Sequence, residues 1–342
     1  MRRFCIVVAF ALALNSACTS EQPTLHVYTW ADYIKPELVT RFEKESACRL
    51  VIDTFDSNEA MYAKLKAGAS GYDVVFPSSY MARTMSRQGM LRDLDRQRLP
   101  NLVHVDPEYL QIALDKDMKY SVPYMLTITG IAYLKSRVPN VEASWSVLDR
   151  ADLKGRMTML NDMRETVGAA LKFLGYSLNT TNEQELRAAR DVVIRWKKNL
   201  AKFENEQYKT GLASGEFLLV QGYSGDILQV QSENDDVAFA VPREGSSLAC
   251  DDMIVLKDSS QVELAHRLIN FLHDPHVAAE NTEFIRYLCP NRPSYAYLTP
   301  ETRSNPTLFP PTEVRRKAEV ITDLGAENAK YTKVWDEIKA AE

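Results

Sequence analysis

This sequence has only one long apolar run, and it lacks the common catalytic and metal-binding motifs. The one extended apolar stretch covers residues 4–14, which is shorter than the about 20 residues that a membrane-spanning helix needs. The chain has no His-Glu-x-x-His motif, no Gly-x-Ser-x-Gly motif, no phosphate-binding loop and no Cys-x-x-Cys pair. We therefore expect neither an enzyme, nor a metal site, nor a bound cofactor.

Cysteine is also scarce. Of five cysteines, Cys48, Cys250 and Cys289 lie well beyond the N-terminal apolar stretch. Three cysteines allow at most one disulfide, so a disulfide scaffold is not expected. A bridge between Cys250 and Cys289 is left open.

The N-terminus has the pattern of a secretory signal, because Arg2 and Arg3 precede the apolar run. Residues 14–18 (LNSAC) are similar to a bacterial lipobox, in which the cysteine is acylated and becomes the new N-terminus. Asn15 departs from the usual aliphatic residue, which leaves cleavage by an ordinary signal peptidase open.

We expect residues 1–17 to be a signal peptide and residues 18–24 to be a tether with Cys18 as its lipid anchor. The protein would then be periplasmic and attached to a bacterial membrane through lipid alone. Cleavage removes two arginines and no acid, so the formal net charge changes from −5 to −7. This acidic balance argues against nucleic acid as a partner.

Short β-rich runs alternate with helical runs along the first 90 residues. Predicted strands and helices follow one another at 25–30, 35–44, 50–55, 59–67, 73–77 and 81–88. The run Val74-Val75-Phe76 is apolar on both faces, which is typical of a parallel strand covered by helices on both sides. A doubly wound α/β lobe is therefore predicted.

A second α/β lobe is predicted further along the chain. Strand-like runs at 121–124 and 130–134 have no long helix between them, so the chain can cross there between lobes. Strands at 156–160, 217–221, 237–241 and 253–256 then accompany helices at 165–174 and 184–200. Short crossovers of this kind behave as hinges.

Aromatic residues and carboxylates recur at the carboxyl ends of the predicted strands: Trp30, Asp32 and Tyr33; Asp162 and Glu165; Tyr223 and Asp226; and Asp252. Open α/β sheets bind ligands at this edge. A cation–π contact contributes about 0.5–2 kcal/mol and a charge-assisted hydrogen bond about 1.5–3 kcal/mol, so the combination suits an ammonium ligand. Core aromatics and helix N-caps have the same pattern, which leaves a purely structural role open.

From residue 25 to the C-terminus the chain resembles the periplasmic spermidine/putrescine-binding proteins of ABC importers. The matching segments are 28–33 (YTWADY), 55–59 (FDSNE), 63–65 (AKL), 71–75 (GYDVV), 77–80 (PSSY), 122–125 (VPYM), 164–165 (RE), 174–176 (LGY), 268–272 (LINFL) and 309–311 (FPP). The resemblance implies a type II periplasmic-binding fold. In this two-lobed clamp each lobe is a mainly parallel sheet flanked by helices, and strand-like crossovers join the lobes.

The resemblance also implies lobe boundaries and site residues. The first lobe is expected over 25–128 and 253–300, and the second over 129–252 and 301–342. The implied ligand contacts are Trp30, Asp32, Tyr33, Ser78 and Tyr80 in the first part of the chain, then Asp162, Glu165, Tyr223, Asp226, Asp252 and Tyr287. The implied function is capture of putrescine or spermidine by a monomer that delivers the polyamine to ABC permease subunits.

Three positions bear on the choice of polyamine. Asp226 is typical of the putrescine-type members, whereas Cys250 and Ile321 stand where the spermidine binders have a tryptophan and a glutamine. These differences favour putrescine over spermidine. The alternative is the same fold with another small solute, either a different cation or an anion held by Arg164 and Ser78.

Overall fold

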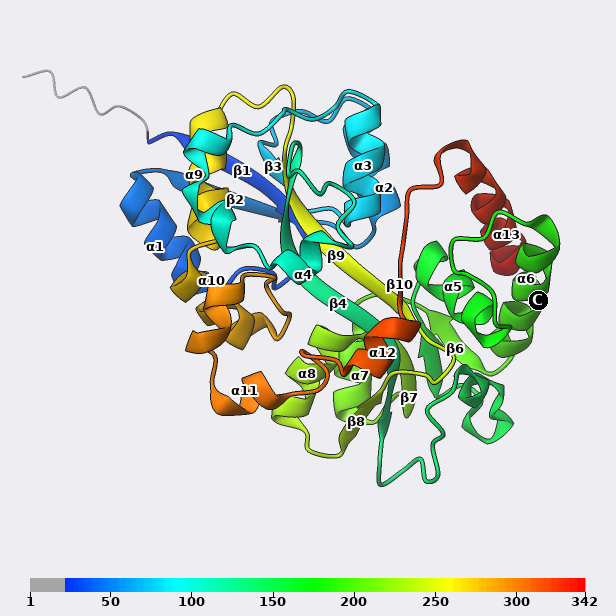
Figure 1. Ribbon diagram of the computed structural model, residues 1–342. Coiled ribbons are helices and arrows are strands. Elements are labelled where there is room, and N and C mark those ends of the chain that lie inside the picture. The colour runs from blue at the N-terminus through cyan, green and yellow to red at the C-terminus, as the bar shows by residue number, and fades with distance from the viewer. Residues whose placement is uncertain (1–21, 342) are drawn as a thin grey trace, which may run out of the picture.

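The structure is a computed structural model that describes residues 22–341 (Figure 1). The predicted signal peptide and the predicted anchor Cys18 lie outside these residues. Within them, no helix is long and apolar enough to cross a membrane. The same residues contain no cluster of three or more side chains suited to holding a metal ion.

Ten strands of the described chain form one mixed sheet in which β2-β1-β3-β9-β4-β7-β5-β6 are neighbours, while β10 pairs with β9 and β8 with β4. The strands are β1 (Thr24–Thr29), β2 (Arg49–Thr54), β3 (Val74–Val75), β4 (Ser121–Leu134), β5 (Met157–Met159), β6 (Leu200–Phe203), β7 (Leu219–Tyr223), β8 (Val237–Ala240), β9 (Ser247–Val255) and β10 (Glu319–Val320).

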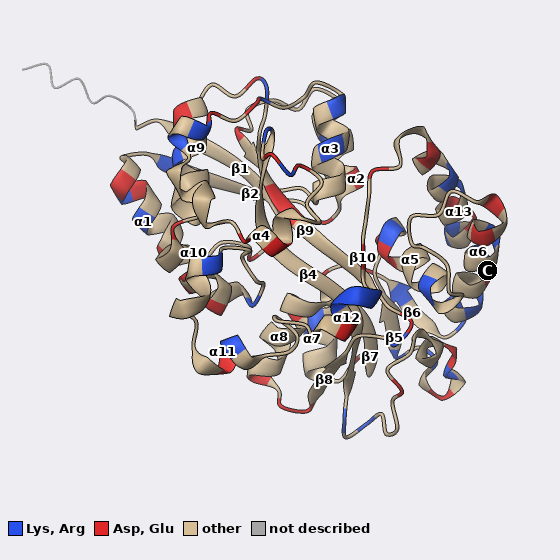
Figure 2. Cartoon of the chain, in the orientation of Figure 1, with Lys and Arg blue, Asp and Glu red and all other residues tan. Residues whose placement is uncertain are grey.

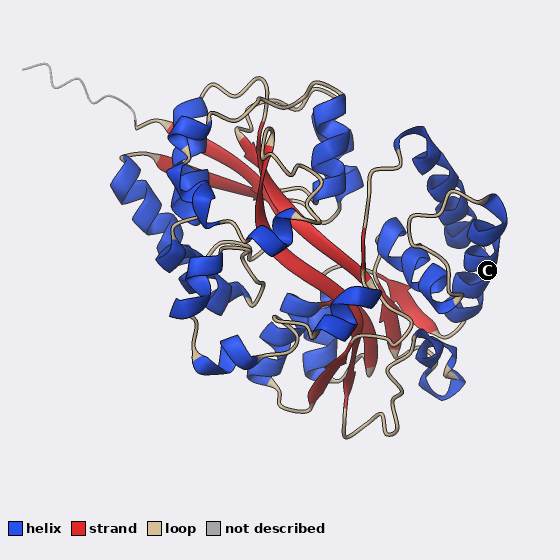
Figure 3. Ribbon diagram, viewed as in Figure 1, coloured by secondary structure: helices blue, strands red, loops and turns tan. Residues whose placement is uncertain are grey.

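Helices cover the sheet on both sides (Figure 3). They are α1 (Pro36–Ser46), α2 (Asn58–Lys66), α3 (Ser79–Arg87), α4 (Pro107–Leu110), α5 (Met163–Phe173), α6 (Glu183–Lys197), α7 (Gln207–Ser214), α8 (Ser224–Glu233), α9 (Val262–Leu272), α10 (Pro275–Ile285), α11 (Pro300–Ser304), α12 (Thr312–Lys317) and α13 (Asn328–Ala340). Short 3₁₀ helices occur at Arg96–Arg98, Pro100–His104, Trp145–Asp149, Ala151–Leu153, Arg292–Tyr297 and Gly325–Glu327.

The sheet has two parallel parts that are joined by two long antiparallel strands. β1 pairs in parallel with β2 and β3, and β5 pairs in parallel with β6 and β7. Between these parts, β4 and β9 run antiparallel and cross diagonally from one lobe to the other (Figure 1). The predicted two-lobed α/β clamp is therefore confirmed, although each lobe also contains antiparallel pairings.

Each lobe has its own apolar core. The first core contains Leu25, Val27 and Phe76, and the second contains Trp196, Leu219 and Val220. All of these side chains are buried. Leu25, Val27, Leu219 and Val220 belong to strands, and their burial is expected for strands that are covered on both faces. The C-terminal helix α13 packs against α5 and α6 of the second lobe.

The predicted lobe boundaries at 128/129 and 252/253 fall inside β4 and β9. The sequence pattern suggested two short strands at 121–124 and 130–134, but the structure has the single strand β4. Similarly, β9 begins at Ser247, six residues before the predicted strand. The exact division of the chain into lobes stays a prediction.

The cysteine question has a simple structural answer. Cys48, Cys250 and Cys289 are all buried and none is bridged to another. Burial raises the pKa of the Cys250 thiol well above its usual value, so this thiol is protonated and weakly reactive at neutral pH.

In the view of Figure 2, acidic and basic residues are interspersed on the helices of both lobes. The net negative charge of the chain is therefore not gathered on one helix. Six acidic residues line the pocket between the lobes that is described next.

Candidate functional site

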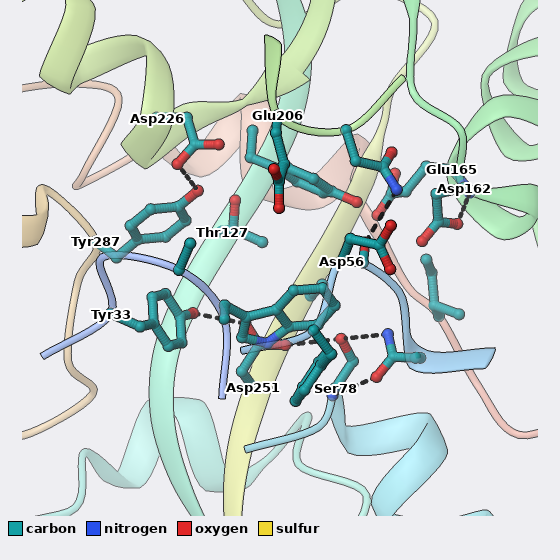
Figure 4. A pocket seen from close by; sticks show the side chains of 18 of the residues that line it. Tyr33, Asp56, Ser78, Thr127, Asp162, Glu165, Glu206, Asp226, Asp251 and Tyr287 are labelled. Atoms are coloured by element: carbon teal, nitrogen blue, oxygen red, sulfur yellow. Dashed lines mark hydrogen bonds between the residues drawn. The ribbon is translucent and has the colours of Figure 1, made fainter. Parts of the chain in front are cut away.

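A pocket of about 100 Å³ lies between the two lobes, beside the crossover strands β4 and β9 (Figure 4). The lining residues are Trp30, Ala31, Tyr33, Phe55, Asp56, Asn58, Ser78, Tyr80, Thr127, Asp162, Glu165, Asn205, Glu206, Lys209, Tyr223, Asp226, Ala249, Asp251, Tyr287 and Ile321. Six of these side chains are carboxylic acids and five are tryptophan or tyrosine. The pocket is thus both acidic and aromatic.

The first-lobe wall is built where β1 and β3 end. Trp30 follows β1 directly, and its ring packs against Phe55 with 4.4 Å between ring centroids. Tyr33 and Ser78 both donate hydrogen bonds to Asp251 on β9, at 2.5 Å to Oδ2 and 2.7 Å to Oδ1. These bonds fix the Asp251 carboxylate at the floor of the pocket.

The second-lobe wall is built at the start of α5. Asp162 is the N-cap of this helix, and its Oδ1 accepts the backbone N–H groups of Arg164 and Glu165 at 2.9 and 3.0 Å. An N-cap of this type satisfies backbone donors at the helix start that have no partner within the helix. Asp162 therefore acts as a helix N-cap, which is the structural role left open by the sequence, and it also lines the pocket.

Glu165 lies one helical turn further along α5, and the two acids occupy the same side of the pocket in Figure 4. Its Oε2 accepts hydrogen bonds from the hydroxyls of Thr129, at 2.6 Å, and Ser247, at 2.5 Å. These hydroxyls come from the crossover strands β4 and β9. The carboxylate is consequently held against the two crossover strands.

Asp226 marks the other side of the pocket in Figure 4. Its Oδ1 accepts the hydroxyl of Tyr287 at 2.8 Å, and its Oδ2 accepts the hydroxyl of Tyr208. The ammonium of Lys209 lies 3.8 Å from Oδ1. Carboxylates thus occur at two separated ends of the pocket, with Asp251 on the floor between them.

Burial changes the protonation of these acids. Burial, reinforced by the neighbouring Asp162, raises the pKa of Glu165 to about 7. Burial also raises the pKa of Asp251 to about 6, and it raises the pKa of Asp162. A cation that enters the pocket favours the ionised form of each acid, so cation binding and proton release are coupled.

Nine of the eleven predicted contact residues line the pocket: Trp30, Tyr33, Ser78, Tyr80, Asp162, Glu165, Tyr223, Asp226 and Tyr287. Asp32 does not, because it is exposed in a turn with a φ of 54°. Asp252 does not either, since it is buried and accepts a hydrogen bond from Ser79 Oγ at 2.8 Å. The binding role of each residue stays a prediction.

The structure differs from the sequence-based expectation at two positions of β9. Asp251, rather than Asp252, places its carboxylate in the pocket, and Ala249, rather than Cys250, lines it. Successive side chains of a strand point to opposite faces, so a shift by one residue exchanges the inner and outer sets. The side chain that β9 contributes to this wall beside Asp251 is therefore the small Ala249.

Arg164, the proposed anion ligand, is not part of the pocket lining. Its side chain is 1% exposed and donates to the Thr322 carbonyl at 3.0 Å and to Asn179 Oδ1 at 2.8 Å. The arginine thus ties α5 to the segment that precedes α13. The anion alternative therefore loses Arg164 as a ligand.

Several lining residues were not anticipated as contacts: Asp56, Asn58, Thr127, Asn205, Glu206, Lys209, Ala249 and Asp251. Asp56 and Asn58 lie in the matched segment 55–59, so their position near the pocket could have been inferred. Asn205, Glu206 and Lys209 come from the start of α7 and the turn before it. This short helix had no clear apolar periodicity in the sequence.

Comparison with known proteins gives the family. Residues 37–310 match the family described as bacterial extracellular solute-binding protein. The chain belongs to this family. A Pseudomonas aeruginosa relative named putrescine/cadaverine-binding protein is 35% identical over 353 residues, which cover 99% of each chain.

Solved structures of the family have the same architecture. A Listeria monocytogenes protein named as a spermidine/putrescine ABC transporter superposes with a TM-score of 0.89 at 34% identity, covering 94% of this chain and 100% of the other. A Treponema pallidum lipoprotein gives a TM-score of 0.83 at 34% identity, covering 92% and 99% of the two chains. The prediction of a solute-binding clamp of the polyamine-transporter type is confirmed at the level of fold and family.

Proposed function

We propose that this protein binds a small aliphatic polyamine between its lobes and presents it to the permease of an ABC importer, without a chemical step. The observation that carries the proposal is the pocket lining, in which six carboxylic acids and five tryptophan or tyrosine side chains surround about 100 Å³. Relatives named for putrescine, cadaverine and spermidine support the same ligand class.

The pocket geometry supports a ligand with cationic ends and an apolar centre. Asp162 and Glu165 lie on one side of the pocket, and Asp251 lies on the floor (Figure 4). A buried ammonium needs a carboxylate or other acceptor close to each nitrogen, since an unpaired buried charge is costly. The aromatic faces of Trp30 and Tyr223 can contact methylenes and ammonium groups.

Closure of the lobes provides the signal to the permease in this proposal. Contacts between the lobes already exist beside the pocket, where Asn205 Nδ2 donates to the Asp56 carbonyl at 3.0 Å. Motion about the crossover strands β4 and β9 opens and closes the pocket as a hinge. A ligand that touches both walls favours the closed form because it binds that form more tightly.

The test is a calorimetric titration of the purified soluble chain, unfolded and refolded to remove any co-purified ligand. Putrescine, cadaverine and spermidine are titrated side by side, with an amino acid and a sugar as control ligands. We expect micromolar or tighter binding of at least one polyamine and none of the controls. Absence of binding to all three polyamines overturns the proposal.

Placement in the cell is part of the proposal. We infer that Cys18 is acylated after removal of residues 1–17 and that the protein is a periplasmic monomer held at the membrane by lipid alone. The lipobox-like segment and the lipoprotein relative of Treponema pallidum support this inference. Mass spectrometry of the membrane fraction should find acyl chains on Cys18, and Cys18→Ala should release the protein; an unacylated Cys18 contradicts the anchor.

A further inference from the structure

Lys209 is a positive charge inside an otherwise acidic pocket. It lies on α7, its side chain is 23% exposed, and its Nζ is 3.8 Å from Asp226 Oδ1. Among the described residues that line the pocket, no other is a lysine or an arginine. The protein thus carries its own ammonium into the space between its lobes.

The Asp226 carboxylate is already occupied. Tyr208 and Tyr287 donate their hydroxyls to its two oxygens, and Lys209 provides the nearby positive charge. The carboxylate is only 16% exposed, so it depends on these partners for stabilisation. A ligand ammonium that approached Asp226 would meet the Lys209 ammonium at the same carboxylate.

The chemistry of Lys209 matches that of the proposed ligand. A lysine side chain is a chain of four methylenes that ends in an ammonium, and putrescine is four methylenes between two ammonium groups. Lys209 therefore places a tethered butylammonium group, which is putrescine without its second ammonium, at the Asp226 end of the pocket. The other acids of the lining remain for a ligand: Asp56, Asp162, Glu165, Glu206 and Asp251.

We propose that Lys209 fills the Asp226 end of the pocket as an internal cation and thereby selects short diamines against the triamine spermidine. This inference rests on the proposed polyamine function. A diamine needs two carboxylate ends, which Asp162 or Glu165 and Asp251 supply. A longer triamine must extend toward Asp226, where repulsion between like charges in a partly desolvated pocket opposes its third nitrogen.

Asp226 has a different role in this arrangement from the one its sequence position suggested. It does not attract putrescine directly, because Lys209 competes for the same carboxylate. It holds the Lys209 ammonium in place, and the pair shortens the pocket that is open to a ligand. Selectivity for the shorter polyamine then comes from the pair rather than from an added acid.

The experiment compares putrescine and spermidine binding to the wild type, Lys209→Met and Lys209→Arg by calorimetry at pH 8. Methionine keeps the length and the apolar stem without the charge, whereas arginine keeps the charge. Lys202→Met serves as the matched control, because Lys202 is an exposed lysine of the neighbouring strand β6 and does not line the pocket. Thermal melting confirms that each variant is folded.

We expect Lys209→Met to increase the affinity for spermidine relative to putrescine by about tenfold or more. Lys209→Arg and Lys202→Met should keep the ratio of the two affinities within about threefold of the wild-type value. If Lys209→Met leaves the ratio unchanged while the wild type binds a polyamine, this inference is wrong and the proposed function stands. If the wild type binds no polyamine, both fail.

Discussion

Asp251 and Asp252 are consecutive residues of β9, yet only the Asp251 carboxylate lines the pocket between the lobes. Asp251 accepts the hydroxyls of Tyr33 and Ser78, whereas Asp252 accepts the hydroxyl of Ser79. The difference follows from the alternation of side chains along a strand. Substitution of Asp251 can therefore be compared with the same substitution of Asp252, a buried aspartate that does not line the pocket.

We predict that Asp251→Asn weakens putrescine binding by about tenfold to a hundredfold, because a hydrogen bond to a charged group contributes about 1.5–3 kcal/mol. Asp252→Asn should change the affinity by less than about threefold. Calorimetry on both variants at pH 8 measures the difference. Equal losses in the two variants, or a loss confined to Asp252→Asn, would show that Asp251 is not the floor contact.

A second prediction concerns the pH dependence of binding. Burial and the neighbouring Asp162 raise the pKa of Glu165 to about 7, and burial raises the pKa of Asp251 to about 6. Below these values the acids are protonated in the ligand-free protein, and a cation must displace their protons to bind. Affinity for putrescine should therefore rise by roughly tenfold or more between pH 5.5 and pH 8, since each unit below a pKa costs about 1.4 kcal/mol.

Calorimetry in buffers with different ionisation enthalpies counts the protons that are released on binding. We expect about one proton at pH 6.5 in the wild type. Glu165→Gln should release fewer and show a flatter dependence on pH. Proton uptake, or an affinity that falls from pH 5.5 to pH 8, contradicts the coupling between these acids and the ligand.

A third prediction concerns stability without ligand. The pKa of Glu165 is raised in the folded protein, so between about pH 4.3, the unfolded value, and about pH 7 the folded state binds more protons than the unfolded state. The contribution of Glu165 to the free energy of unfolding is therefore present at pH 4 and lost as the pH rises through 7. The full loss across this range is on the order of 4 kcal/mol, because each pKa unit of difference corresponds to about 1.4 kcal/mol.

Urea unfolding at pH 5 and pH 8 isolates this contribution when the wild type is compared with Glu165→Gln. The variant should gain stability relative to the wild type as the pH rises, because its side chain cannot ionise. The glutamine oxygen can still accept the hydroxyls of Thr129 and Ser247, which keeps the local hydrogen bonds comparable. A constant difference between the two proteins at both pH values would show that Glu165 has an ordinary pKa.

Much of the fold could be predicted from the sequence because local patterns and tertiary packing agree. The buried run Val74-Val75-Phe76 and the alternation of strands and helices indicate two covered α/β lobes. The prediction divided β4 into two strands at 121–124 and 130–134, whereas the structure has one strand. Within this strand a Cβ at Gly130 would lie 2.5 Å from Phe239 Cζ, so the glycine allows β4 and β8 to pack closely.

The site could be predicted only in part. Residues that follow strand ends, such as Trp30, Asp162 and Tyr223, were identified because that edge of a sheet is where ligands bind. The family resemblance implied Asp252 as a contact, but Asp251 lines the pocket. The two side chains are chemically identical, and the sequence did not show which face of β9 each of them occupies. Lys209 had no sequence signal, since its place in the pocket depends on how the short helix α7 packs.

A final prediction concerns Trp30, which lines the pocket and packs against Phe55. If its ring faces the ligand ammonium, Trp30→Ala should weaken putrescine binding by about twofold to thirtyfold, which corresponds to the 0.5–2 kcal/mol of a cation–π contact. Trp30→Phe should retain part of this affinity because phenylalanine keeps an aromatic face.

Trp335→Ala is the matched control. Trp335 is a partly buried tryptophan on α13 that packs against Phe203, and it is not part of the pocket lining. Its removal should lower the melting temperature but leave the putrescine affinity within about twofold. Equal losses of affinity for Trp30→Ala and Trp335→Ala would mean that general destabilisation, rather than contact with the ligand, explains the effect at Trp30.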